Sequence, residues 1–190
     1  MCGIAGLWLI NSSPEPEIRE TLDRLINAIS HRGPDDSGIW INEEIGLGLG
    51  HRRLSILDLS TAGHQPMTSK SGRYLIIFNG EIYNHLELRN QLEIAGRLRA
   101  NWHGLSDTET LIEATESWGL KKTLERISGM FSFALWDKEA KKLFLARDHF
   151  GEKPLYWGFL AGYGIIFASD LIAFRGIKKL HVYSKKDKDS

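Results

Sequence analysis

Residues 1–10 read MCGIAGLWLI, and the interpretation of the whole chain starts from this stretch. The apolar run from Ile4 to Ile10 is short and compact, which is typical of a buried strand and places Cys2 at the tip of a first strand. Cys2 is the only cysteine in the chain. Once Met1 is removed, Cys2 carries a thiol and a free α-amine, a nucleophile beside its own base. An α-amino group has a pKa of about 7.7–8.0, so it can accept a proton near neutral pH.

The bulk composition indicates one soluble domain and excludes several classes of function. A chain of 190 residues can bury a substantial core in one domain. The 24 basic residues equal the 24 acidic ones, so we expect no nucleic-acid and no membrane-surface binding. The first apolar run is too short to span a membrane and lacks the basic flank of a signal peptide. A single cysteine cannot form an internal disulfide, which suits a cytoplasmic location.

Strand patterns dominate both ends of the chain, and helical patterns dominate its middle. Strands are expected over 4–10, 38–41, 45–54, 74–78, 131–136, 143–147, 155–159 and 163–168. Apolar residues at helical spacing predict helices over 16–30, 86–95 and 107–118. Ser106 and Glu109 fit a capping box at the start of the last helix. This order predicts an α+β fold. The lysine-rich residues 178–190 are expected to be disordered.

Four residues offer the groups that a thiolate attacking the amide of an amino acid requires. The oxyanion of the tetrahedral intermediate needs hydrogen-bond donors held in place beforehand. The Asn79 side-chain amide and the Gly80 backbone N–H offer such a pair. An amino-acid substrate also has a carboxylate, which an arginine binds through two parallel hydrogen bonds, and an ammonium, which pairs with an acidic group. Arg53 and Asp107 have these properties.

Taken alone, each of these residues also has a purely structural interpretation. Asn-Gly is the commonest hairpin-turn signal, so Asn79 and Gly80 fit a turn. Asp107 fits an acidic side chain that opposes the positive end of a helix. Arg53 fits a surface strand residue, and Cys2 fits a small buried apolar side chain. The individual residues therefore leave these alternatives open.

Several motifs that occur in order give a more specific indication. They are MCGIAG at 1–6, HRGPDDSG at 31–38, HRRLSILDLS at 51–60, GHQPM at 63–67, FNGEIYN at 78–84, SDTET at 106–110, GMFSFALWD at 129–137 and ARDHFGEKPLYWG at 146–158. Together they closely resemble the glutaminase domain of glutamine-dependent asparagine synthetases, within the class II glutamine amidotransferases, which are N-terminal-nucleophile hydrolases. The resemblance covers about residues 2–170. Pro34-Asp35 favours the asparagine-synthetase branch.

The resemblance implies a fold, a domain division and a role for each matching residue. The fold would be a four-layer αββα sandwich over residues 1–175, and residues 176–190 would be a polar, disordered tail or the start of a linker. Cys2 would be the nucleophile, with its own α-amine as the general base. Asn79 and Gly80 would form the oxyanion hole and contact the substrate. The other substrate-binding positions implied are Arg53 at the α-carboxylate, Leu54, Ser55, Ile56 and Leu57 through their backbone, and Glu81 and Asp107 at the α-amino end.

The implied reaction is the hydrolysis of L-glutamine in two halves. The Cys2 thiolate attacks the side-chain amide, which releases ammonia and leaves a γ-glutamyl thioester, and water then hydrolyses the thioester to glutamate. We expect no metal and no cofactor in this domain. ATP and Mg are expected only in an ATP-pyrophosphatase-type synthetase domain, whose SGG-type phosphate loop does not occur in this sequence. The expected partners are L-glutamine and that synthetase domain or subunit, and a homodimer is left open.

The acceptor of the ammonia also stays open, because relatives of this type amidate aspartate or other substrates such as sugar acids. The alternative function is a non-catalytic module that binds glutamine or docks on a synthetase, in which Met1 stays in place. A papain-like hydrolase would instead need a histidine beside Cys2. Packing or loop-fixing roles are expected for His31, His51, His64, Asp148 and Lys153.

Overall fold

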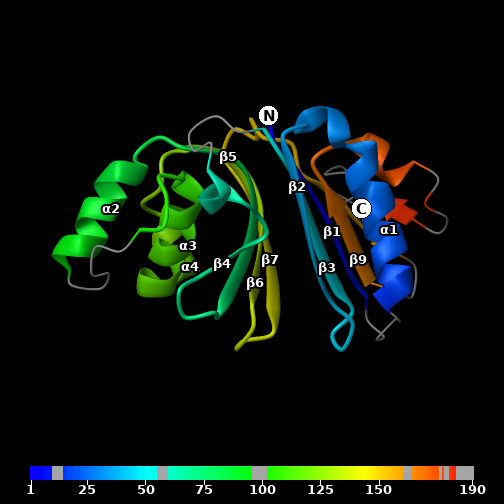
Figure 1. The fold of residues 1–190 in the computed structure, drawn as a ribbon, viewed down its shortest axis with the longest axis horizontal. Coiled ribbons are helices and arrows are strands. Elements are labelled where there is room, and N and C mark those ends of the chain that lie inside the picture. Colours follow the sequence, from blue (N-terminus) through cyan, green and yellow to red (C-terminus); the bar gives the residue numbers. More distant parts are fainter. Residues whose placement is uncertain are drawn as a thin grey trace, which may run out of the picture.

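A computed structural model describes residues 1–9, 15–54, 60–95, 102–160, 164–175, 177 and 180–182. These residues form four layers, with two sheets stacked face to face between helices (Figure 1). Helix α1 (Glu15–Ala28) covers the outer face of one sheet. Helices α2 (His85–Ile94), α3 (Asp107–Trp118) and α4 (Leu120–Leu124) cover the outer face of the other. The predicted αββα sandwich is confirmed.

Both sheets are antiparallel throughout. The larger sheet has the strand order β10-β8-β9-β1-β3-β2. Its strands are β1 (Gly3–Leu9), β2 (Asp36–Asn42), β3 (Leu47–Arg53), β8 (Tyr156–Leu160), β9 (Gly164–Ala168) and β10 (Leu180–Val182). The smaller sheet has the order β4-β5-β6-β7, with β4 (Met67–Thr68), β5 (Tyr74–Ile82), β6 (Gly129–Asp137) and β7 (Lys142–Arg147). Strand β1 lies between β3 and β9, so the chain's N-terminus enters the centre of the larger sheet.

Three hydrophobic cores separate the four layers. The period-two alternation of a strand assigns neighbouring residues to different cores. In β5, Ile77 faces the other sheet and packs in the central core, which also contains Ile4, Leu49, Trp136 and Phe167. Its neighbour Phe78 faces the helices and packs with residues of α2 and α3. The third core lies under α1, whose buried face has the predicted helical spacing of Ile18, Leu22, Leu25, Ile26 and Ile29.

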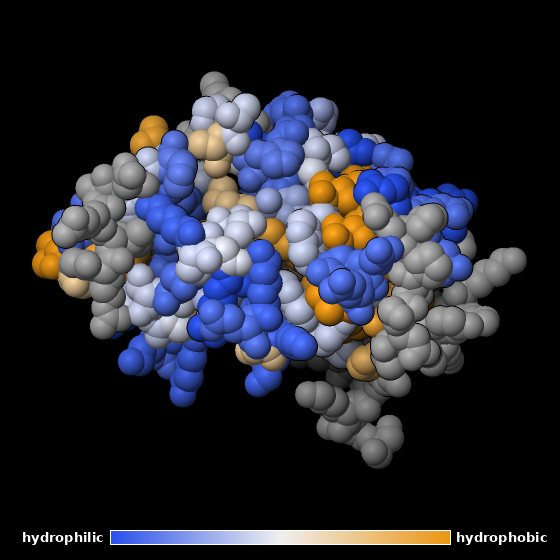
Figure 2. Space-filling model, turned by 60° about the horizontal axis from the view of Figure 1, so that its bottom comes forward, coloured by the Kyte–Doolittle hydropathy of each residue, from blue (hydrophilic) through white to orange (hydrophobic). Residues whose placement is uncertain are grey.

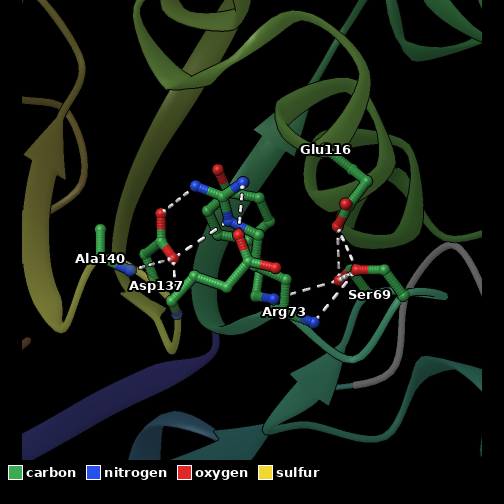
Figure 3. Close-up of polar contacts among 8 residues, drawn as sticks. Ser69, Arg73, Glu116, Asp137 and Ala140 are labelled. Carbon is green, nitrogen blue, oxygen red and sulfur yellow. Dashed lines mark hydrogen bonds and ion pairs between the residues drawn. The ribbon is translucent and has the colours of Figure 1, made fainter.

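Polar contacts fix the start of β5 against α3 and β6 (Figure 3). Glu116 in α3 accepts hydrogen bonds from the hydroxyls of Ser69 and Ser71 at 2.8 and 2.7 Å. The guanidinium of Arg73 donates two hydrogen bonds to the Asp137 carboxylate, at 3.1 and 2.7 Å. Arg73 holds the pKa of Asp137 below its ordinary value, because the neighbouring positive charge favours the carboxylate. The Glu116 contacts hold α3, which carries part of the site described below, in place on its sheet.

The structure corrects several expectations about secondary structure. Asn79 and Gly80 lie inside β5, which continues to Ile82 because β6 pairs with it along its whole length, so the hairpin-turn alternative is wrong. Strand β10 pairs with β8 inside the segment expected to be disordered, so that expectation is wrong for Leu180–Val182. Residues 176, 178–179 and 183–190 lie outside the described part. The short elements β4 and α4 were not predicted.

The face shown in Figure 2 is largely hydrophilic, and hydrophobic residues are confined to separate small areas on it. Within the described part of the chain, no helix has the length and apolar character needed to cross a membrane.

Candidate functional site

A cavity of about 160 Å³ lies where the first strand begins and where β3 ends. Ligand pockets for drug-sized molecules span roughly 300–1,000 Å³, so this volume suits a smaller molecule. It brings together seven of the residues that the sequence predicted for the site. They are Cys2, Arg53, Leu54, Asn79, Gly80, Glu81 and Asp107. The predicted positions Ser55, Ile56 and Leu57 lie outside the described residues.

Cys2 precedes β1 and is held against the end of β3. Its Sγ accepts a hydrogen bond from the Leu54 N–H at 3.4 Å and lies 3.6 Å from the Leu54 carbonyl oxygen, to which the thiol donates. The carbonyl of Cys2 accepts a hydrogen bond from Arg32 Nε at 3.2 Å. Burial raises the pKa of the Cys2 thiol, and the Leu54 N–H and the positive N-terminus oppose that shift only partly. A neutral thiol of this kind needs a base before it can act as a nucleophile.

Asn79 provides a buried donor at the cavity. Its side chain lies on the same face of β5 as Ile77, toward the space between the sheets. It is 1% exposed, and its Nδ2 has no hydrogen-bond partner among the described residues. An unsatisfied buried N–H group costs free energy, so such a group in a cavity wall is a candidate for binding a ligand.

The Gly80 backbone faces the same cavity. Backbone groups alternate sides along a strand, and on the edge of β5 away from β6 the N–H of Phe78 bonds to Gln65 and the N–H of Ile82 bonds to Asp107. Gly80 lies between these two residues, so its N–H points to that open edge. A Cβ at Gly80 would lie 2.3 Å from the Met130 carbonyl oxygen, so only glycine fits here.

Arg53 supplies a buried positive charge at the end of β3. Its Nη1 donates to the Ser60 carbonyl oxygen at 2.9 Å, and the side chain is largely buried. Gly63 makes room for the guanidinium, because a Cβ at that position would lie 2.1 Å from Arg53 Nη2. These contacts hold the Arg53 guanidinium in the cavity wall.

Asp107 is the first residue of α3, and its carboxylate accepts a hydrogen bond from the Ile82 N–H at 2.8 Å. Ser106 caps the helix by accepting from the Glu109 N–H at 3.3 Å, as predicted, but Glu109 bonds to residues 103 and 104 instead of completing the capping box. Burial raises the pKa of Asp107 to about 6, and the nearby charge of Glu81 adds to this effect. An acidic pair with one buried and one half-buried member is suited to a cation.

Sequence reasoning missed several residues of the cavity wall. Gln65 and Thr108 line it and bond to each other, and Gly63 seats Arg53. Gln65 and Gly63 belong to the motif GHQPM, which was recognised without a role for either residue. Lys153 was expected only to help folding. Its backbone does bond to Asp148 and Arg147, but its Nζ also reaches the cavity, 3.0 Å from Met1 Sδ.

The other residues expected to have structural roles do make structural contacts. His51 is fully buried, and its Nε2 donates to the Phe78 carbonyl oxygen at 3.1 Å, which links the two sheets. Burial lowers the pKa of His51 to about 4, so it is neutral at physiological pH. His64 pairs with Asp36 at 2.7 Å, and His31 lies 3.6 Å from Asp170. Asp148 accepts hydrogen bonds from the backbone of residues 131, 152 and 153.

Comparisons with known proteins find relatives with similar sequences. The chain is 37% identical over 175 residues to asparagine synthetase (glutamine-hydrolyzing) 3 of Bacillus subtilis, an alignment that covers 91% of this chain and 27% of that protein. It is 41% identical over 158 residues to asparagine synthetase (glutamine-hydrolyzing) 1 of the same organism, covering 83% of this chain and 24% of that protein. The chain thus spans about a quarter of the length of these two relatives.

A solved structure shares the fold. The glutamine phosphoribosylpyrophosphate amidotransferase of B. subtilis superposes with a TM-score of 0.75 at 21% identity, covering 91% of this chain and 43% of that one. The family described as the glutamine amidotransferase domain matches residues 1–188. With this match over nearly its whole length, the chain belongs to the glutamine amidotransferase domain family.

Proposed function

We propose that this domain hydrolyses the side-chain amide of L-glutamine through a thioester on Cys2. One observation carries the proposal: four groups surround a single small cavity. They are the only cysteine, a buried amide donor with no hydrogen-bond partner among the described residues, a buried cation and a buried acid. Glutamine has a matching group for each of them. Its carboxylate pairs with Arg53, its ammonium with Asp107 and Glu81, and its side-chain amide lies at Cys2.

The reaction runs in two steps that use only this chain, glutamine and water. With Met1 removed, the α-amine of Cys2 takes the thiol proton, and Sγ attacks the amide carbon of glutamine. Asn79 Nδ2 and the Gly80 N–H donate to the oxyanion of the tetrahedral intermediate. The intermediate collapses as the protonated α-amine gives its proton to the leaving nitrogen, which departs as ammonia. Water then cleaves the thioester to glutamate, so we propose no metal and no organic cofactor for this domain.

The ammonia is proposed to serve an amidation of the asparagine-synthetase type. Support for this comes from the names of relatives such as those of B. subtilis, in which the matching region makes up about a quarter of the protein. The partner is then an ATP-pyrophosphatase-type synthetase domain or subunit that binds ATP and Mg and amidates aspartate. A sugar acid is the alternative acceptor.

The test is the intact mass of the purified protein before and after incubation with a diazo-ketone analogue of glutamine. The proposal expects a mass without Met1 and a single adduct, which peptide mapping places on Cys2, together with release of ammonia from glutamine. Cys2→Ala is the matched control and should form no adduct. Retained Met1 with neither adduct nor ammonia release would refute the proposal and favour a non-catalytic module.

A further inference from the structure

Gln65 occupies a position between the two halves of the cavity wall. Its side chain is 5% exposed and uses both ends of its amide. The Oε1 atom accepts a hydrogen bond from the Phe78 N–H at 2.6 Å. The Nε2 atom donates to Thr108 Oγ1 at 3.2 Å. The two bonded residues lie on different elements, β5 and α3, so this one amide joins a strand to a helix.

The hydrogen bond from Phe78 to Gln65 lies on the edge of β5 just beyond the residues that pair with β4. Strand β4 pairs only with Leu75 and Ile76, so no strand among the described residues lies beside the polar groups of Phe78 on that edge. Two buried side chains replace the missing strand. Gln65 accepts from the Phe78 N–H, and His51 donates to its carbonyl oxygen. The backbone N–H and the carbonyl oxygen of Phe78, the residue before Asn79, are therefore both bonded to side chains.

The bond to Thr108 acts at the first turn of α3. Thr108 follows Asp107 and is 3% exposed. Asp107 bonds in turn to the Ile82 N–H, two residues beyond Gly80 on the same edge of β5. Gln65 thus fixes the spacing between the donors at residues 79 and 80 and the acid at the start of α3.

We infer that Gln65 is a positioning residue that sets both the oxyanion donors and the ammonium-binding acid at the distance glutamine requires. This inference rests on the proposed function. A catalytic site loses activity when its groups move by as little as about 1 Å, so the loss of a buried bridge between two halves changes kinetics as well as stability. The Phe78 end influences turnover through Asn79, and the Thr108 end influences substrate binding through Asp107.

The experiment compares three variants in steady-state ammonia release from glutamine. Gln65→Met keeps the length of the side chain and removes both hydrogen bonds. Thr108→Val keeps the shape of Thr108 and removes only its hydroxyl. Thr115→Val is the matched control, because Thr115 is also buried in α3 and its hydroxyl donates to the Leu111 carbonyl oxygen at 2.9 Å, away from the cavity. Melting temperatures are recorded for all three.

The variants are expected to separate kcat from KM. Gln65→Met should lower kcat by about tenfold or more and raise KM by about threefold or more. Thr108→Val should raise KM by about three- to tenfold with kcat within about twofold of wild type. Thr115→Val should lower the melting temperature and leave both kinetic constants unchanged. If Gln65→Met does not fold, Gln65→Asn, which is one methylene too short to bridge both partners, is measured against the same expectations.

Two results would overturn the inference. One is a Gln65 variant whose kcat and KM match those of Thr115→Val. The other is a Thr108→Val enzyme whose KM equals that of wild type. The failure of the proposed function looks different, because the wild-type protein itself would then release no ammonia and take up no diazo-ketone label.

Discussion

Replacing Asp107 with asparagine is expected to stabilise the fold and weaken the enzyme. The Asp107 carboxyl is buried at the start of α3, where its pKa is raised to about 6 from an ordinary 3.8, mainly by burial. The folded protein therefore holds a proton on this group more tightly than the unfolded chain does. An asparagine keeps a carbonyl oxygen that accepts the Ile82 N–H but carries no charge.

The size of the effect follows from the two pKa values. Each unit of pKa difference corresponds to about 1.4 kcal/mol. The Asp107 pKa differs between 3.8 in the unfolded chain and about 6 in the fold, so the ionised carboxylate lowers the free energy of unfolding by about 3 kcal/mol. For a raised carboxyl pKa, the free energy of unfolding falls as the pH rises from about 3.8 to about 6. The cost is thus fully present near pH 7.5 and absent near pH 3.5. In a domain of this size, about 3 kcal/mol corresponds to about 6–12 °C in melting temperature.

The assay is thermal unfolding of the wild type and Asp107→Asn at a series of pH values from about 3.5 to 7.5. The variant should melt higher at pH 7.5, and the difference should vanish at low pH. Asp137→Asn is the control of opposite sign, because Arg73 lowers the pKa of Asp137 and its carboxylate stabilises the fold (Figure 3). That variant should melt lower at pH 7.5. The reasoning would be refuted if the melting temperatures of Asp107→Asn and the wild type were equal at pH 7.5, or differed by the same amount at every pH.

The same substitution tests the proposed role of Asp107 in binding. Loss of a charged hydrogen-bonding partner costs about 1.5–3 kcal/mol, so KM for glutamine should rise by about 10- to 150-fold in Asp107→Asn. In the wild type, KM should rise as the pH falls below about 6, because the protonated acid no longer attracts the ammonium. An unchanged KM in the variant would show that Asp107 does not contact the substrate.

Three further substitutions test the remaining groups of the site. Asn79→Ala should lower kcat by about 10²–10³-fold with little change in KM, and a loss confined to KM in ammonia-release kinetics would contradict a role in the oxyanion hole. Gly63→Ala should raise KM by about tenfold at similar kcat, because the new Cβ displaces the Arg53 guanidinium; titration calorimetry with glutamine checks this. Cys2→Ala should release no ammonia, but its melting temperature should still rise in the presence of glutamine. A melting temperature that does not rise would show that Cys2 is needed for binding.

Most helices and strands could be predicted from the sequence because local patterns report them directly, whereas the stacking of four layers was implied only by the resemblance to a known family. The helical spacing of Ile18, Leu22 and Leu25 gives the buried face of α1, and the apolar start of the chain gives β1. Asn79-Gly80 was ambiguous, because the dipeptide favours a turn and only the distant partner β6 keeps it in a strand. The strands β4 and β10 are two and three residues long and exist through pairing alone, which leaves no local signal.

The candidate site could be predicted for residues with a distinctive chemistry and for residues at positions that the family motifs mark. Cys2, Arg53 and Asp107 carry reactive or charged groups, and the structure places them around one cavity. The roles proposed for them stay predictions. Gln65 lies in the recognised motif GHQPM, but its role could not be predicted, because its two hydrogen-bond partners lie 13 and 43 positions away in the sequence. The role of Gly63 could not be predicted either, because it depends on the absence of a Cβ, which leaves room for the Arg53 guanidinium.

The charges of the cavity explain why this site suits a substrate that carries both an ammonium and a carboxylate. In the free protein, burial raises the pKa of both Cys2 and Asp107, so the cavity favours the neutral form of each group. An ammonium placed beside Asp107 reverses that preference, because an opposite charge within about 4–6 Å favours the carboxylate. A carboxylate placed beside Arg53 accepts two parallel hydrogen bonds from its guanidinium. Binding of a zwitterionic amino acid therefore relieves electrostatic costs that the empty fold carries, and a neutral amide without these two charges should bind far more weakly.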